Sequence, residues 1–229
     1  MTLSTIQQFA IWVLPLITAI TVHEAAHAYA AYYFGDNTAK SLGRVSLNPI
    51  KHIDWLGSVL IPILMLVSKM GFIFGWAKPV PIDYHKLKNP KQNMIWIALA
   101  GPLSNLVMGI LWAIILRLCA LTNIQNEAII FIIFMAVAGI MINTILLVLN
   151  LLPLPPLDGS RILSGVLPNK WSVIYNKVEP YGFFIIIGLM IFGLLGIILN
   201  PFINLFLSLL ADISGISPHL LVSFLETIQ

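Results

Sequence analysis

The chain alternates long apolar stretches with short polar connections, a pattern that predicts helices crossing a membrane. A bilayer is spanned by roughly 20 apolar residues. Four stretches approach this length, from about Thr5 to Phe34, Met94 to Cys119, Ala128 to Leu152 and Tyr181 to Leu199. Glycine, proline, asparagine or charged residues follow them, as is usual where helices end. The pattern predicts an all-α polytopic membrane protein.

A shorter apolar run, Trp55–Ser68, is followed by a segment, 71–81, whose glycines and prolines disfavour a helix. Basic loops lie on both sides of this region, and basic loops tend to be cytoplasmic. We therefore predict a re-entrant element near 55–81, in which a short helix enters the membrane and an extended segment returns. The alternative is a plain short span that leaves one basic loop outside.

The C-terminal part offers two shorter apolar pieces, Pro201–Leu210 and Pro218–Phe224. They are either one broken helix or pieces lying on the membrane surface, and the sequence does not choose between these. In total we expect five to six transmembrane segments and the re-entrant element. They form a single membrane-embedded domain over 1–229, with a core at 5–170 and C-terminal helices at 180–229.

The amino-acid composition is also typical of a membrane protein. The chain is 59% hydrophobic and only 9% charged, with a mean hydropathy of +0.95, whereas soluble domains carry about 25% charged residues. The net charge of +3 comes from basic residues gathered in loops, which indicates topology rather than nucleic-acid binding. The single cysteine, Cys119, implies no disulfide. Residues 1–8 lack a basic region, so we expect no cleavable signal peptide.

The first apolar stretch contains His23-Glu24-x-x-His27. On a helix, His23 and His27 share one face. Two imidazoles so placed can bind one Zn²⁺, and Glu24 can take a proton from the attacking water. Ionisable groups at bilayer depth are costly and usually functional. With about 1.5 Å of rise per residue, His27 lies roughly 10 Å before the helix end, which puts the expected metal inside the membrane.

A catalytic zinc site needs a third protein ligand and an open position. Asp158 is the best candidate, because it follows a proline-broken loop on the same side as the C-terminal end of the first helix. Its carboxylate would also offset part of the metal charge. Alternatively, Asp158 only caps a helix that begins near Ser160.

These motifs resemble the site-2 protease family of intramembrane zinc metalloproteases. The resemblance rests on His23-Glu24-x-x-His27, Gly101-Pro102-x-x-Asn105, Asn150-x-x-Pro153-x-x-Pro156-x-Asp158-Gly159 and Asp158-Gly159-x-Arg161-Ile162-Leu163. The histidine motif alone is short, but the combination, in this order and on apolar segments, is specific. It covers about Thr18 to Lys170. No PDZ or CBS domain is present, so the chain looks like a minimal member, with the 55–81 region as an insertion.

The resemblance implies that His23, His27 and Asp158 bind one zinc ion and that Glu24 is the catalytic base. It also implies that Asn150, and with it Asn105, helps to hold the scissile peptide or its oxyanion. Both asparagines could instead form hydrogen bonds between helices.

We therefore expect a zinc metalloendopeptidase that hydrolyses peptide bonds of transmembrane substrates within or near the bilayer, as in regulated intramembrane proteolysis. The expected partners are a transmembrane protein or peptide and the lipid bilayer, with no nucleic acid; the sequence indicates no oligomeric state. The expected location is a bacterial plasma membrane, with the site toward the cytoplasm.

The same residues are also compatible with two other functions. A divalent-metal transporter should carry further polar ligands along a route and often a repeat, but here the polar groups converge on one point. An inactive relative that binds membrane segments is disfavoured by the intact Glu24. For the protease, the extended 71–81 segment could pair with a locally unwound substrate.

Overall fold

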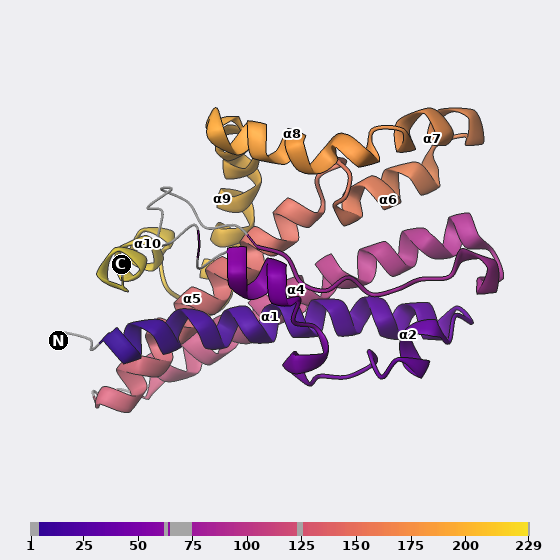
Figure 1. Cartoon of the computed structure of the whole chain (residues 1–229). Helices are drawn as coiled ribbons and strands as arrows, with labels where there is room; N and C mark the ends of the chain where they lie inside the picture. Colours follow the sequence, from indigo (N-terminus) through magenta and orange to yellow (C-terminus); the bar gives the residue numbers. More distant parts are fainter. Residues whose placement is uncertain (1–4, 62–63, 65–74, 123–125, 229) are drawn as a thin grey trace.

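The computed structural model describes residues 5–61, 64, 75–122 and 126–228. Throughout these residues the regular elements are helices, as Figure 1 shows. Four described helices are long and apolar enough to cross a membrane: α1 (Thr5–Tyr33), α4 (Pro90–Leu121), α5 (Glu127–Asn150) and α9 (Leu194–Ser214). The prediction of an all-α polytopic membrane protein is confirmed.

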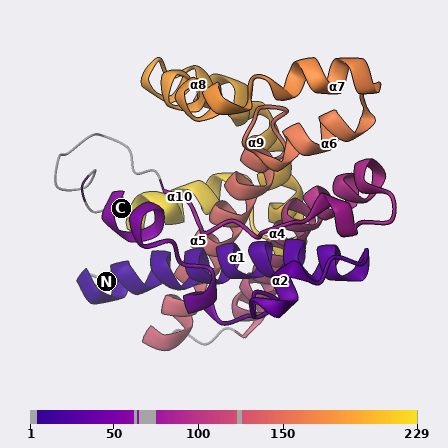
Figure 2. The same ribbon diagram turned by 45° about the vertical axis from the view of Figure 1, so that its right-hand side comes forward.

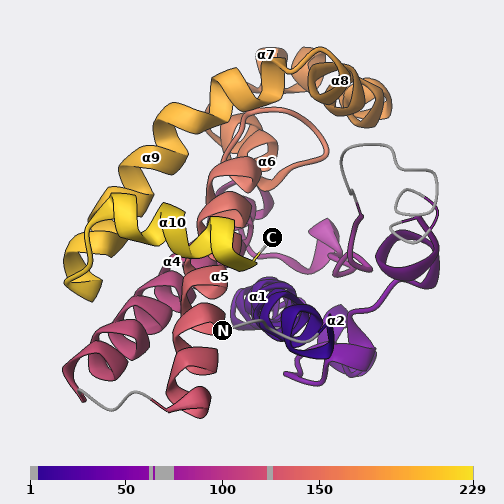
Figure 3. The ribbon, with the colours of Figure 1, turned by 90° about the vertical axis from the view of Figure 1, so that its left-hand side faces the viewer.

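Helices α1, α4 and α5 form a central bundle, which Figure 3 shows with α1 seen nearly along its axis. Small residues at the contacts permit this close packing, as in other membrane helix bundles. Ala19 and Ala28 of α1 are completely buried. A Cβ added to Gly139 of α5 would lie 2.5 Å from the ring of Trp112 in α4. Any larger side chain at residue 139 would therefore push α4 and α5 apart.

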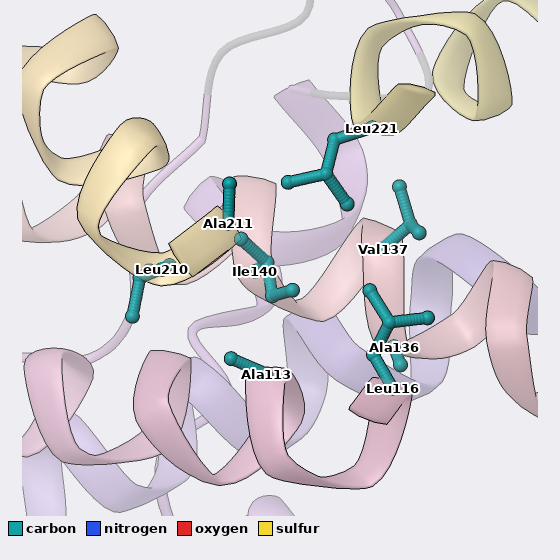
Figure 4. Close-up of a cluster of buried hydrophobic side chains, with 8 residues drawn as sticks. All are labelled: Ala113, Leu116, Ala136, Val137, Ile140, Leu210, Ala211 and Leu221. Atoms are coloured by element: carbon teal, nitrogen blue, oxygen red, sulfur yellow. The ribbon is translucent and has the colours of Figure 1, made fainter. Parts of the chain in front are cut away.

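The C-terminal helices complete the bundle. A buried apolar cluster joins α4, α5, α9 and α10 (Pro218–Ile228), and Figure 4 shows its side chains: Ala113, Leu116, Ala136, Val137, Ile140, Leu210, Ala211 and Leu221. Helix α9 runs through Pro201, and α10 packs back onto the bundle. The two C-terminal pieces are therefore parts of two separate helices.

One predicted span is wrong in its bounds. The apolar stretch Tyr181 to Leu199 is broken after α8 (Glu179–Ile191), where Gly193 adopts a left-handed conformation with φ 68° before α9 begins. Glycine reaches this conformation without the steric cost that other residues meet. Helix α8 is bent by 60° against α7 (Asn169–Asn176), so the described helices give four spans, or five if this bent pair counts as one.

The chain around the predicted re-entrant element enters and leaves at one end of the bundle. Helix η2 (Trp55–Leu60) is described, and residues 75–83 are extended. Three hydrogen bonds join the loop before η2 to the chain after residue 75. The amide of Lys78 donates to the carbonyl of His52 (2.9 Å), and the amide of Asp83 donates to Oδ2 of Asp36 (2.8 Å). In the third, Nζ of Lys86 donates to Oγ1 of Thr38 (2.8 Å). A single complete span would have separated these loops. Residues 62–63 and 65–74 of the predicted element lie outside the described residues.

Three short helices, α2 (Thr38–Ser41), η1 (Pro49–Lys51) and η3 (Tyr84–Lys86), lie in these loops. The extended segment follows α1 toward its C-terminal end (Figure 1), where the side chain of Val80 packs with Ala28 and Ala39.

A proline-rich turn after α5 leads into α6 (Asp158–Val166), which packs along α4 (Figures 1 and 2). The turn lies directly on the first turn of α6, because a Cβ on Gly159 would lie 2.3 Å from the carbonyl oxygen of Leu151. A Cβ on Gly165 would likewise lie 2.3 Å from Ile95 of α4. These two close contacts hold the start of α6 against the proline-rich turn and its end against α4.

Candidate metal centre

Two histidines one turn apart on α1 face α4. His23 and His27 are each only 7% exposed, and their Nε2 atoms lie 3.0 Å apart. Gly101 of α4 lies against both rings, since a Cβ there would come within 2.3 Å of His27 Nε2 and 2.5 Å of His23 Cε1. The rings therefore occupy the space that any side chain at residue 101 would need.

The carboxylate of Asp158 reaches the same point from the start of α6. Its Oδ2 atom lies 3.3 Å from Nε2 of His23 and 3.2 Å from Nε2 of His27. This oxygen is buried, and it has no hydrogen-bond donor among the described residues.

The three ligand atoms have the spacing of a tetrahedral zinc site. Nitrogen and oxygen ligands lie about 2.0–2.1 Å from zinc, which separates any two corners of a tetrahedron by about 3.3 Å. The observed separations are 3.0, 3.2 and 3.3 Å. Among the described residues, these three form a cluster able to hold a metal ion. One corner is left for a water molecule or a substrate oxygen.

The hydrogen bonds behind the rings fix which nitrogens face the centre. Nδ1 of His27 lies 2.7 Å from the carbonyl oxygen of Ile97, and Nδ1 of His23 lies 2.7 Å from Oδ1 of Asn105. Both partners are acceptors, so each Nδ1 carries the proton and each neutral ring presents an Nε2 lone pair. Two such lone pairs and a carboxylate oxygen repel one another unless a cation lies between them. The donor set therefore fits Zn²⁺.

Glu24, the predicted base, follows His23 directly and is partly buried. Within the described part of the chain, no hydrogen bond occupies its carboxylate. Such a carboxylate is free to accept a proton from water.

The two predicted substrate-binding asparagines are placed differently. Asn105 is completely buried behind His23, and its amide is fully used: Oδ1 accepts from His23, and Nδ2 donates to Oδ1 of Asn143 (3.0 Å) and to the carbonyl of Ala19 (3.4 Å). This is interhelical hydrogen bonding, the alternative role of Asn105, and both ends of its amide are engaged within the described residues. Asn150, the last residue of α5, is partly buried and donates to the carbonyl of Leu146 at 3.0 Å. Its Oδ1 and second N–H have no hydrogen-bond partner among the described residues.

Sequence reasoning missed three contributors: the carbonyl of Ile97, the empty space at Gly101, and Asn143. Of these, only Asn143 could have been identified from the sequence, because an amide in the middle of an apolar span needs a polar partner. The other two contributions come from backbone positions, which a residue pattern does not reveal.

Comparison with known proteins agrees with this site. The family model of Peptidase family M50 matches residues 11–193. The chain is 38% identical over 201 residues to YwhC of Bacillus subtilis, a candidate zinc metalloprotease, covering 84% of this chain and 85% of that protein. It is 28% identical over 224 residues to Rip2 of Mycolicibacterium smegmatis, also a candidate zinc metalloprotease, covering 95% and 79%. No solved structure is significantly similar to the chain.

Proposed function

The chain belongs to Peptidase family M50, the site-2 protease family, and on that premise we propose that it is an intramembrane zinc endopeptidase that cleaves transmembrane substrates. One observation carries the proposal. Two imidazole lone pairs and a buried carboxylate oxygen converge with tetrahedral spacing at the turn of α1 that carries Glu24. The three ligands imply one zinc ion per chain.

Zinc, when bound, polarises the scissile carbonyl and lowers the pKa of water to about 7. The remaining chemistry belongs to the side chains. Glu24 accepts the proton of the attacking water and passes it to the leaving amine. The open N–H of Asn150 donates to the oxyanion that forms at the attacked carbonyl.

A transmembrane substrate must unwind locally before its peptide bond can be attacked, and the extended segment supports a way to hold it. The amides of Trp76 and Lys78 donate to the carbonyls of Gly57 and His52, which occupies one edge of the segment. Residues alternate between edges in extended backbone, so Ala77 faces the other edge. Its peptide groups have no partner among the described residues. We propose that the substrate pairs with Ala77. Residues 71–74 of this segment lie outside the described residues.

This pairing has a sharp test. Ala77→Pro removes the N–H, whereas Ala77→Ser keeps it. We expect the proline variant to lose cleavage of a transmembrane peptide while still binding zinc, and the serine variant to cleave normally. Cleavage by the proline variant at the wild-type rate would contradict the pairing.

We infer that water reaches the site along α6. A polar cavity of about 300 Å³ lies along α6, with Lys91, Ser160 and Arg161 among its lining residues. Ser160 is two residues from Asp158. Basic residues gather at this end of the bundle, which supports a cytoplasmic orientation in a bacterial plasma membrane.

The function is tested with purified wild type and Glu24→Gln, with Glu127→Gln as a matched control at the start of α5. Zinc content and cleavage of a transmembrane peptide are measured for each. All three should bind one zinc, and only Glu24→Gln should lose cleavage. Equal cleavage by wild type and Glu24→Gln would overturn the mechanism. Zinc flux into liposomes without cleavage would favour the transporter.

A further inference from the structure

Three buried polar side chains form a line of hydrogen bonds across the bundle. The line starts at Nδ1 of His23 on α1, passes through Asn105 of α4 and Asn143 of α5, and ends at the carbonyl oxygen of Gly139. Its steps measure 2.7, 3.0 and 2.8 Å. Asn105 is 0% exposed and Asn143 is 1% exposed. Water therefore does not compete for these hydrogen bonds.

The acceptor at the far end of the line fixes the orientation of both side-chain amides. A backbone carbonyl can only accept, so the Nδ2 group of Asn143 faces Gly139 and its Oδ1 faces Asn105. Asn105 must then direct Nδ2 toward Asn143 and Oδ1 toward His23. Nδ2 of Asn105 also donates to the carbonyl of Ala19, at a longer 3.4 Å. An oxygen that faces His23 requires a protonated Nδ1, which leaves Nε2 unprotonated toward Asp158.

His27 obtains the same orientation directly, because its Nδ1 donates to the backbone carbonyl of Ile97. That acceptor cannot rotate. The acceptor of His23 is a side-chain amide, whose two ends can exchange by a half turn. An amide with its N–H toward His23 would favour the other tautomer, with the proton on Nε2. Something must hold the amide of Asn105 in one orientation.

We propose that Asn143 is a positioning residue of the metal centre, which acts through Asn105 to keep Nε2 of His23 free for the metal. This inference rests on the proposed function only in taking His23 as a zinc ligand. Asn143 makes no hydrogen bond to His23 or Asp158 within the described residues. Its effect on metal binding is therefore indirect, like that of other outer partners of metal ligands.

Two variants separate this role from simple packing. Asn143→Leu fills a similar volume but cannot accept from Asn105, so zinc affinity should fall about 10- to 100-fold. Asn143→Asp in this apolar setting is held neutral. Its O–H can donate to Gly139 and its C=O can accept from Asn105, so zinc affinity should stay within about threefold of wild type. A packing role predicts the opposite order, since leucine suits an apolar core better than a carboxyl group.

The adjacent Thr144 supplies the control. It is also 1% exposed, and its hydroxyl has no hydrogen-bond partner in the part of the chain that the structure describes. Thr144→Val should leave zinc affinity unchanged. A second readout needs no metal: ¹⁵N NMR of ring-labelled histidine in the zinc-free protein should show Nδ1-protonated His23 in wild type and Asn143→Asp, and mixed tautomers in Asn143→Leu.

Unchanged zinc affinity in Asn143→Leu, or equal losses in the leucine and aspartate variants, would overturn the proposal. An equal loss in Thr144→Val would do the same. A wild type that binds zinc but cleaves no peptide would contradict the proposed function and leave the role of Asn143 standing.

Discussion

Gly101 of α4 lies so close to His27 of α1 that a Cβ at residue 101 would be 2.3 Å from the Nε2 atom of that histidine. The ring cannot simply move aside, because its Nδ1 atom is held by the carbonyl of Ile97 at 2.7 Å. The absence of a side chain at residue 101 is therefore part of the metal centre.

We accordingly expect Gly101→Ala to reduce zinc affinity by more than about 10-fold, since displaced ligands bind zinc poorly. Zinc is measured by competition with a chelating dye in detergent. Gly188→Ala is the matched control, because a Cβ at that helical glycine meets nothing within 4 Å. Wild-type zinc affinity in Gly101→Ala would show that the histidine rings have other room to move.

The second prediction distinguishes whether Asp158 is a zinc ligand or only a helix cap. Asp158→Asn keeps the shape but removes the charge, so zinc affinity should fall by more than about 100-fold, beyond the loss expected for an outer partner. If Asp158 were only a helix cap, the substitution would lower the melting temperature and leave zinc affinity unchanged. The structure already gives the cap position of α6 to Leu157, with no side-chain hydrogen bond.

The third prediction concerns the buried carboxylate of Asp36, which ties the end of α1 to the segment after residue 75. It is 0% exposed and accepts from the amides of Thr38 and Asp83. Burial raises the pKa of Asp36, but these hydrogen bonds and the charge of Lys86 lower it more, so the net pKa is below the usual value. Asp36→Asn should cost about 2 kcal/mol of stability at pH 7, because its new N–H₂ group must face a donor.

The pH dependence of that cost has a definite sign. A carboxyl with a depressed folded-state pKa stabilises the protein fully above its unfolded pKa of about 3.9 and loses this contribution as pH falls through the folded value. The difference in unfolding free energy between wild type and Asp36→Asn should therefore be constant near neutral pH and shrink below about pH 4. The exposed Asp212, replaced by asparagine, is the control and should change little. A difference that grows in acid would contradict this account.

The fourth prediction tests the topology. In a Cys119→Ala background, cysteines at Lys51 and Lys86 should react with a membrane-impermeant reagent from the same side, because their loops lie together at one end of the bundle. A cysteine at Thr122, just after the other end of α4, should react only from the opposite side. Labelling of Lys51 and Lys86 positions from opposite sides would exclude the re-entrant arrangement.

Much of this architecture could be predicted from hydrophobicity alone. The predicted stretches Thr5 to Phe34 and Met94 to Cys119 end within a few residues of the ends of α1 and α4, because polar residues follow each helix directly. The predicted Tyr181 to Leu199 span was wrong because the break at Gly193 lies inside an uninterrupted apolar run. In such a run only the backbone conformation marks the end of a helix.

The candidate site likewise contains residues that the sequence predicts and residues that only packing places. His23, Glu24 and His27 are predictable from spacing, since the helical period alone puts the histidines on one face. The approach of Asp158 depends on the tight contact at Gly159, and the orientation of Asn105 depends on Asn143. Such contacts arise from the packing of distant segments, and no local pattern contains them.

The ligands come from α1 and α6, so the site is completed in a fixed order during synthesis. During synthesis, His23 and His27 enter the membrane long before Asp158 leaves the ribosome. A nascent chain that stops short of α6 holds an incomplete ligand set. On the proposed function, the ligand set is therefore complete only after most of the bundle has been inserted.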